Sequence, residues 1–290
     1  MKLVSKNKLE EKFERWDMET EKHHCFTAAG VIVHNSNCRV GLVKESNENG
    51  EPEWIWMAGS NSVQRKEFVN VTHRFKWPDI ISRFHISCEP QIDESFVHSG
   101  YTWKITSIIE PKPESEEQVL KVQVTAINED GTDVLKRSEY WEPLTDDVKS
   151  MILHIKDKHF PEPVSVIVYA EIFGAGVQDM VYGLTGRNFR VFDIAINNKY
   201  IDFDDKKELC EKFNVPMVPV LYKGPFSVKK LEEFTNGPTT MCEAKIAGAF
   251  KGREGIVVTL AGKEVDFKTR RIIKSVSADY LARKGGTEFH

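Results

Sequence analysis

The sequence predicts an α+β fold built on antiparallel sheets. Short runs of β-branched and aromatic residues bounded by turn residues recur along the chain, and helical periodicity appears between them. The strand-like runs are residues 39–43, 54–57, 104–109 and 120–124. The helical segments are residues 146–158, 205–213 and 228–234. This mixture of elements is typical of an α+β architecture.

Two local patterns support this prediction. Residues 45–50 end in Asn-Gly between two strand-like runs, which predicts a hairpin turn. In the first helical segment the apolar residues fall on one helical face, which predicts an α-helix. These residues are Val148, Met151, Ile152 and Ile155.

Length and composition indicate an ordinary globular protein. The chain has 290 residues, enough for one large core or two modest ones, with 40% hydrophobic and 29% charged residues. A net charge of -4 argues against a generally basic nucleic-acid coat, although a basic groove can coexist with an acidic remainder.

The five cysteines form no close pair of the kind that zinc or redox sites use. Without a membrane-length apolar run or a signal peptide, we expect a cytoplasmic protein and no membrane partner.

Residues 1–35 end in a distinctive run. The sequence His-His-Cys-Phe-Thr-Ala-Ala-Gly-Val-Ile-Val-His-Asn-Ser fills residues 23–36, after a strand-like Asp-Met-Glu-Thr at residues 17–20. This run resembles the last two sequence blocks of an intein, which typically end in His-Asn before Ser, Thr or Cys. The segment starts at Met1 and contains no N-terminal splicing block, as is typical of a split intein. Residues 1–35 are therefore expected to be a short, β-rich intein C-terminal fragment. A segment of this size needs a partner to fold against, either the rest of the chain or another polypeptide.

The intein resemblance implies a splicing role for four residues. The Ser36 hydroxyl would capture the upstream protein segment from a thioester or ester. The side-chain amide of Asn35 would then attack its own backbone carbonyl, form a cyclic imide and cut the chain. His34 and His24 are the expected proton donors or acceptors, since imidazole serves either role near neutral pH.

Three later segments resemble ATP-dependent RNA ligases of the phage RNA ligase 2 group, which are covalent nucleotidyltransferases. Tyr-Ala-Glu-Ile-Phe-Gly at residues 169–174 is similar to a motif with a Gly-Glu-x-Phe-Gly core, with Ala170 in place of its first glycine. Phe-Asp-Ile at residues 192–194 and Glu-Gly-Ile-Val-Val at residues 254–258 resemble two further motifs. The resemblance implies an antiparallel-sheet nucleotidyltransferase (adenylation) domain over residues 36–290.

The ligase resemblance also implies cofactors and residue roles. Glu171 and Glu254 would contact the ribose and organise the metal, because Mg²⁺ prefers hard oxygen ligands. Phe192 would stack on the adenine of ATP. Lys274 would neutralise the α-phosphate, in a chemistry that depends mostly on positioning and charge.

The last motif departs from the family pattern. The family often has two lysines separated by one residue, whereas Ile272 and Val276 flank Lys274 at that spacing. Lys284 or Arg283 remain as substitutes for the second lysine. Residues 271–277 therefore match the motif only loosely.

The nucleotide-accepting lysine of this family is missing from the sequence. That lysine stands in the motif Lys-x-(His or Asp)-Gly-(Ser or Thr)-Asn, and only its continuation, Ser-Asn-Cys-Arg-Val-Gly, is present at residues 36–41. We interpret the splice junction as lying inside this motif, so that an N-terminal half supplies the lysine by protein trans-splicing. Asn37 would then contact the nucleotide, and Arg65 resembles the arginine of the next ligase motif.

Residues 75–137 have no place in the family core. They are β-rich and are expected to be an inserted small domain, or an elaboration that binds nucleic acid. The residues expected to grip nucleic acid are Arg74, Lys76, Trp77 and Trp103. The expected substrate of the joined enzyme is RNA with nicked or broken ends.

Two alternatives to the split RNA ligase remain open. One is a non-catalytic nucleotide- or nucleic-acid-binding protein that kept the ligase fold and lost the lysine, with residues 1–35 as an ordinary extension. The other is an ATP-dependent DNA ligase. The sequence after Lys274 shows no obvious further domain, which argues against a typical DNA ligase.

Overall fold

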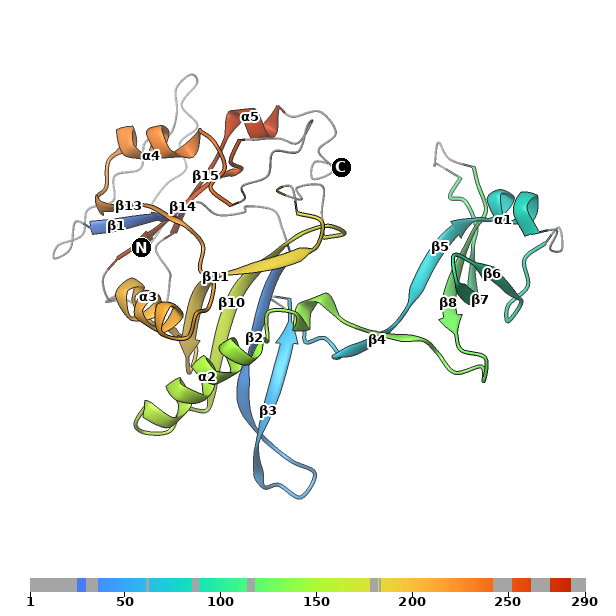
Figure 1. The fold of residues 1–290 in the computed structure, drawn as a ribbon, viewed down its shortest axis with the longest axis horizontal. Coiled ribbons are helices and arrows are strands. Elements are labelled where there is room, and N and C mark those ends of the chain that lie inside the picture. Colours follow the sequence, from blue (N-terminus) through green and yellow to red (C-terminus); the bar gives the residue numbers. More distant parts are fainter. Residues whose placement is uncertain are drawn as a thin grey trace.

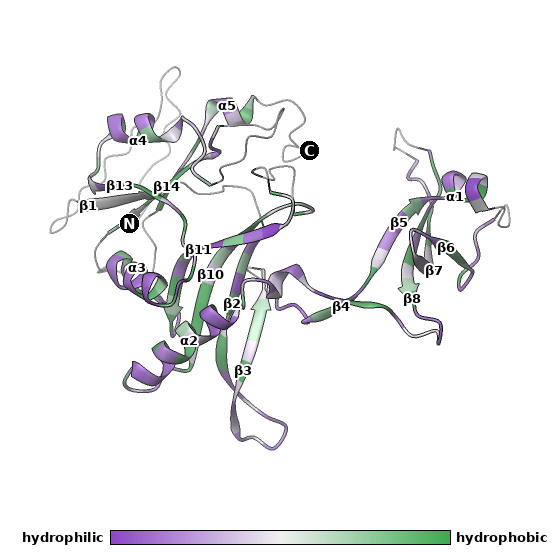
Figure 2. Cartoon of the chain, viewed as in Figure 1, coloured by the Kyte–Doolittle hydropathy of each residue, from purple (hydrophilic) through white to green (hydrophobic). Residues whose placement is uncertain are grey.

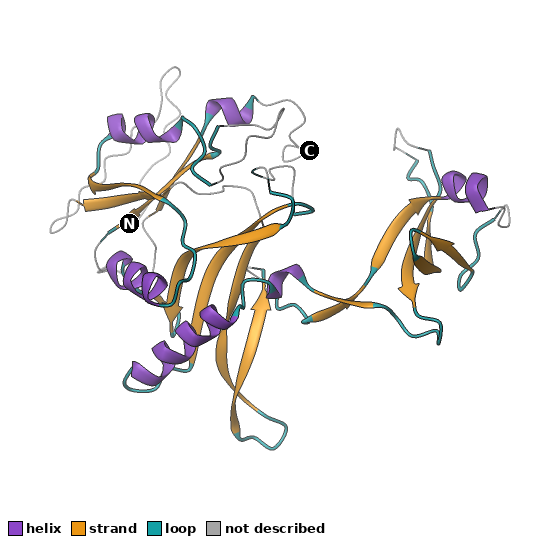
Figure 3. Ribbon diagram, viewed as in Figure 1, coloured by secondary structure: helices purple, strands orange, loops and turns teal. Residues whose placement is uncertain are grey.

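The structure is a computed structural model with α-helices, strands and antiparallel sheets (Figure 3). It describes residues 25–29, 36–60, 63–84, 89–113, 118–177, 182, 184–241, 252–261 and 272–282. The predicted α+β class with antiparallel sheets is confirmed. No helix in these ranges is long and apolar enough to span a membrane.

The central sheet of the main body has the strand order β12-β11-β10-β2-β3, and each neighbouring pair is antiparallel. Its strands are β12 (Lys199–Tyr200), β11 (Arg187–Ile196), β10 (Ser165–Gly174), β2 (Ser36–Ser46) and β3 (Pro52–Gly59). Strand β10 is predominantly apolar (Figure 2), as is typical of an interior strand that is buried along most of its length.

The hairpin between β2 and β3 forms where the Asn-Gly signal predicts it. Gly50 has φ +79°, a backbone conformation that glycine adopts at no steric cost. The Asn47 side-chain oxygen accepts hydrogen bonds from the backbone N–H groups of Asn49 and Glu51, at 3.0 and 2.9 Å. The turn fixes the register in which Val40 lies opposite Ala58.

Two helices cover one face of this sheet. Helix α2 (Asp146–Lys158) matches the predicted segment, and Thr145 caps it by accepting a hydrogen bond from the backbone N–H of Val148. All four apolar residues predicted for its inner face are buried in the main core. Helix α3 (Phe203–Lys212) begins two residues before its predicted start, with Asp202 as its N-cap.

A second antiparallel sheet has the order β13-β1-β14-β15. Its strands are β13 (Val220–Pro225), β1 (Cys25–Ala29), β14 (Gly255–Leu260) and β15 (Ile272–Val276). The helices α4 (Val228–Thr235) and α5 (Ala278–Leu281) lie beside this sheet, as Figure 1 shows. Strand β1 lies between β13 and β14, so a piece of the N-terminal segment is an interior strand of this sheet.

A small lobe stands apart from the main body, linked through the two-stranded ribbon of β4 (Phe68–Asn70) and β9 (Leu135–Arg137) (Figure 1). The 3-10 helix η1 (Glu139–Trp141) follows β9. The sheet of the lobe has the order β5-β8-β7-β6. Its elements are β5 (Thr72–Lys76), α1 (Trp77–Phe84), β6 (Ser95–His98), β7 (Tyr101–Ile109) and β8 (Lys121–Ile127).

The lobe corrects one expectation about nucleic-acid contact. Trp77 and Trp103 were expected to grip nucleic acid, but their side chains are only 2% and 6% exposed. They form the core of the lobe with Ile105, Val122 and Val124, because large aromatic rings gain most from burial. Neither ring is available for stacking on a base.

Two of the five cysteines have described side chains. Cys38 and Cys210 are buried free thiols. Burial raises the pKa of Cys38 to about 12 and that of Cys210 to about 11. Both thiols are therefore protonated at neutral pH and pack as small apolar core residues.

Candidate active site

Glu171 lies in the middle of the central sheet on β10. In register it is opposite Asn37 of β2 on one side and Arg190 of β11 on the other. Side chains alternate along a strand, so the neighbours Ala170 and Ile172 point into the main core while Glu171 points to the other face. Glu171 is only 4% exposed, which is rare for a carboxyl group without a structural or functional reason.

Glu254 lies directly before β14 in the second sheet and is 1% exposed. Its carboxylate accepts a short hydrogen bond from the Tyr182 hydroxyl, and its backbone carbonyl accepts one from the N–H of Ser277 at 2.8 Å. Gly255 has φ +154°, and a Cβ there would overlap the Ser275 carbonyl oxygen. Glycine therefore lets β14 run close to β15 beside this carboxylate.

The two carboxyl groups interact although they come from different sheets. Burial raises the pKa of Glu171 well above its usual range, and the negative charge of Glu254 raises it further. The Lys274 ammonium on β15 acts in the opposite direction and lowers this pKa. Lys274 is itself exposed. The sequence therefore predicted three residues that the structure brings into one electrostatic cluster.

Strand β2 contributes polar atoms that face the same side as Glu171. The Asn37 side-chain oxygen and the Arg39 Nε are buried and have no hydrogen-bond partner within the described residues. An unsatisfied buried polar atom costs on the order of 1–3 kcal/mol. Such atoms next to a buried carboxylate are suited to contact a polar ligand.

Phe192 lies on β11, at the bulge where the register with β10 shifts. Its half-buried ring is 6.3 Å from the Tyr169 ring, and its backbone carbonyl accepts a hydrogen bond from Lys206 Nζ at 2.6 Å. Lys206 Nζ also lies 3.6 Å from the Asp193 carboxylate. Burial lowers the pKa of Lys206 to about 8.

Arg65 makes its described contacts outside the cluster of Glu171, Glu254 and Lys274. Its exposed guanidinium stacks over the Tyr140 ring at 5.4 Å, and its backbone carbonyl accepts a hydrogen bond from the Trp141 indole at 2.9 Å. No described contact connects Arg65 with Glu171 or Glu254.

Sequence reasoning missed several residues of this region. Tyr182 holds Glu254 and packs edge-on against the Phe173 ring at 5.6 Å, but it stands in no motif. Arg190 lies opposite Glu171 and over the Phe173 ring at 5.5 Å. Strand alternation could have identified Arg39, two residues after Asn37.

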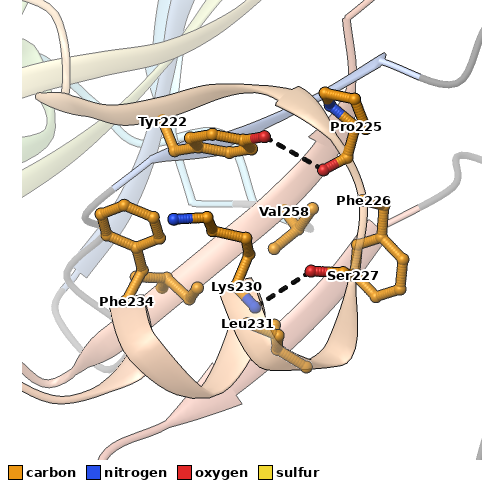
Figure 4. A pocket seen from close by; sticks show the side chains of 9 residues that line it. Tyr222, Pro225, Phe226, Ser227, Lys230, Leu231, Phe234 and Val258 are labelled. Carbon is orange, nitrogen blue, oxygen red and sulfur yellow. Dashed lines mark hydrogen bonds between the residues drawn. The ribbon is translucent and has the colours of Figure 1, made fainter.

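A pocket under α4 lies apart from this cluster (Figure 4). The stacked rings of Tyr222 and Phe234 are 5.5 Å apart, with Lys230 Nζ 5.5 and 5.4 Å from their centres. Figure 4 also shows the Tyr222 hydroxyl donating to the Pro225 carbonyl. Its lining contains no carboxylate, so its chemistry differs from that of the buried acid pair.

The splicing residues are only partly covered by the structure. His24, His34 and Asn35 lie outside the described residues, as do Lys284 and Arg283. The backbone of Ser36 is described and begins β2.

Residues 111–276 match the model of the RNA ligase family. This match includes Glu171, Phe192, Glu254 and Lys274 and covers more than half of the chain. The chain belongs to the RNA ligase family. Asn37 and Arg65 lie outside the matched residues.

Solved structures of Naegleria gruberi RNA ligase are similar to this member of the RNA ligase family. An arginine-to-alanine mutant with ATP and Mn has 14% identity and a TM-score of 0.45, covering 89% of this chain and 51% of the other. A glutamate-to-alanine mutant with AMP and Mn has 14% identity, a TM-score of 0.43 and the same coverage. The chain thus spans about half the length of these relatives. No curated protein matches it.

The raised pKa of Glu171 leads to a testable pH dependence. Its folded pKa is raised above the usual 4.5, so the neutral form suits the fold and ionisation destabilises it as the pH rises. Between the usual and the raised pKa, the free energy of unfolding should fall by about 1.4 kcal/mol per pH unit. We expect Glu171→Gln to be more stable than the native chain above this window and equally stable below it.

Urea unfolding of both chains over a pH series measures this difference. Glu48→Gln, in the exposed β2–β3 turn, is the control and should leave the native pH dependence in place. A constant difference between native chain and Glu171→Gln at all pH values would contradict the assignment.

Proposed function

We propose that this chain is the C-terminal precursor of an ATP-dependent RNA ligase, completed by protein trans-splicing. The register of β2 carries the proposal. Ser36 lies opposite Ile172 and Asn37 opposite Glu171, so the proposed junction stands at the end of β2 beside the buried acid pair. A lysine a few residues upstream in a joined chain would therefore arrive next to Glu171, Glu254 and Lys274.

The cluster suits the phosphoryl chemistry of such an enzyme. Lys274 would neutralise the α-phosphate of ATP while the incoming lysine amine attacks it and pyrophosphate leaves. The joined enzyme would then transfer AMP from lysyl-AMP to an RNA 5′-phosphate and seal the ends by attack of the RNA 3′-hydroxyl, which releases AMP. Phe192 would hold the adenine, and Asn37 would use its unsatisfied oxygen on the nucleotide. Arg65 is proposed as a further nucleotide-binding residue on the motif resemblance alone.

The acid pair also fits a divalent cation such as Mg²⁺. Burial and then the charge of Glu254 raise the pKa of Glu171, and a cation between the two carboxyl groups would offset both effects. No group of three or more His, Cys, Asp or Glu ligands occurs in the described ranges. A bound Mg²⁺ would therefore keep water or phosphate oxygens among its ligands, and it would supply charge neutralisation at the phosphates.

The position of β1 adds a requirement to the splicing proposal. If residues 1–35 are excised, β13 and β14 lose the strand that pairs with both of them. Unpaired interior backbone groups are costly, so the N-terminal half must supply a replacement strand as well as the lysine. Residues 1–35 would then serve as a temporary strand of the ligase sheet.

The same observation favours a second candidate. A strand that pairs on both sides within the sheet is also what an ordinary N-terminal extension would provide. Under this candidate the chain is a non-catalytic nucleotide- or nucleic-acid-binding protein of ligase fold. The two candidates differ in whether residues 1–35 are ever released.

Self-adenylation tests the proposed function. The chain of residues 1–290 is incubated with ATP labelled at the α-phosphate, alone and together with an N-terminal half whose ligase part ends in Lys-x-(His or Asp)-Gly. We expect label only on the joined product, with the adenylate mapped to the partner's lysine. An adenylate on a lysine within residues 36–290 would overturn the proposal, and sealing of nicked DNA in preference to nicked RNA would favour a DNA ligase.

A further inference from the structure

The sheet of the small lobe has two unlike faces. Alternate residues of its strands, such as Val122 and Val124 of β8, pack with Trp77 and Trp103 into the apolar core. The intervening residues form the opposite face, which we call the polar face. It consists of Thr72, Arg74, Lys76, Ser95, Val97, Thr102, Lys104, Ser107, Ile109, Lys121, Gln123, Thr125 and Ile127.

The charge of this polar face has one sign. The strands β5, β6, β7 and β8 contain no aspartate or glutamate, although the chain as a whole has 44 acidic and 40 basic residues. Four basic side chains lie on the face, from three adjacent strands. They are Arg74, Lys76, Lys104 and Lys121. Arg74 and Lys76 are exposed, and Lys104 and Lys121 are half-buried.

Two of these cations oppose each other directly. Lys76 of β5 and Lys121 of β8 are cross-strand partners in register. Two positive side chains next to each other on neighbouring strands raise the positive potential at this point of the face. The placement therefore favours an anionic ligand over a neutral one.

The neutral residues of the polar face suit a phosphate backbone as well. Thr102 and Ser95 border Lys104, and Gln123 borders Arg74 across the strands. Hydroxyl and amide groups beside lysine and arginine are the usual contacts to phosphate and sugar oxygens. The face offers no accessible aromatic ring for base stacking, since Trp103 faces the core.

We propose that the polar face binds the sugar-phosphate backbone of the RNA substrate, with Arg74, Lys76, Lys104 and Lys121 as its phosphate contacts. This rests on the proposed function for the identity of the ligand as RNA. Charge complementarity selects a polyanion, and membership of the RNA ligase family selects RNA among the polyanions. Binding is insensitive to base sequence and strongly dependent on salt, because the contacts are to the backbone.

RNA binding by the full chain of residues 1–290 tests this proposal without splicing or adenylation. A fluorescently labelled single-stranded RNA is titrated with the native chain and with the triple variant Arg74→Gln, Lys104→Gln, Lys121→Gln. We expect the variant to raise the Kd by about 10-fold or more at low salt. The slope of log K against log salt should also become shallower by about two, since each lost phosphate contact removes roughly 0.7.

A second triple variant controls for net charge. Lys158→Gln, Lys207→Gln and Lys229→Gln change exposed lysines of the main body by the same total charge. We expect this variant to bind RNA nearly as the native chain does. Equal losses in both triple variants, or no loss in the first, would overturn the proposal.

A charge-retaining variant distinguishes the loss of positive charge from misfolding of the lobe. Lys104→Arg with Lys121→Arg keeps the positive charge of the face and should retain RNA affinity. The tryptophan fluorescence of each variant, compared with that of the native chain, shows whether the core around Trp77 and Trp103 has changed. Loss of binding in the arginine variant with an intact core would contradict a backbone-phosphate role. Tighter binding of a double-stranded DNA of equal charge than of RNA would assign the face to another ligand.

If the face binds RNA as expected but no self-adenylation follows joining, the proposed ligase function fails and the RNA site stands. If adenylation occurs but the triple variant binds RNA normally, the RNA site fails and the ligase function stands. The two experiments therefore separate the two proposals.

Discussion

Asn35→Ala should abolish the release of residues 1–35 from the chain when it is combined with its N-terminal half. In the proposed splicing reaction the side-chain amide nitrogen of Asn35 is the nucleophile that cleaves the chain after this residue, and alanine has no such group. The upstream capture by Ser36 should survive, so a branched or unresolved intermediate should accumulate. Intact-mass measurement over time follows the loss of the fragment and the appearance of the joined ligase.

Two variants frame this experiment. Asn49→Ala, in the exposed turn between β2 and β3, removes an asparagine side chain far from the junction and should leave release at the native rate. Ser36→Ala should block transfer of the upstream segment, because the hydroxyl that captures it is gone. Undiminished release from Asn35→Ala would refute the splice junction and leave the non-catalytic ligase-fold protein as the better account.

Lys274→Ala should lower the rate of self-adenylation of the joined enzyme by about 10²–10³-fold, the usual loss when one donor to a developing negative charge is removed. The lysine stands on β15 within the electrostatic field of Glu171, as its effect on the pKa of that carboxyl group shows. Its removal would leave the acid pair without this cation next to the triphosphate. Label incorporation from α-labelled ATP in single-turnover conditions measures the rate.

A lysine outside the cluster provides the matched control. Lys229→Ala, on the exposed side of α4, removes the same charge and should change the rate less than twofold. Lys274→Arg keeps the charge with a different geometry and should recover part of the activity. A Lys274→Ala enzyme that labels itself like the native one would remove this lysine from the proposed chemistry.

The helix α2 and the hairpin of β2 and β3 could be predicted because the sequence patterns that define them lie within the elements themselves. Helix α2 has its predicted bounds and buries its four predicted residues, since a 3.6-residue period and a threonine cap suffice to define it. The Asn-Gly turn likewise fixed the hairpin of β2 and β3. Glu171 and Glu254 were selected from motif resemblance, and the structure brings these distant residues together, although their roles stay predictions.

Long-range pairing could not be read from the same signals. Nothing in Cys25–Ala29 indicates that it pairs with both β13 and β14, because those partners are about two hundred residues away and pairing depends on the whole sheet. The burial of Trp77 and Trp103 was also missed. Aromatic residues in a polar, basic stretch suit either a core or a binding surface, and only the packing of α1 on the lobe sheet decides between them.

The interior position of β1 bears on how the protein would behave in a cell. A strand that is withdrawn before another replaces it exposes two ladders of backbone amides and carbonyls, which readily pair with neighbouring molecules. Aggregation should therefore accompany premature loss of the N-terminal segment, and the synthesis of two partner polypeptides would need to be balanced. Before the partner arrives, residues 1–35 would then keep the rest of the chain soluble.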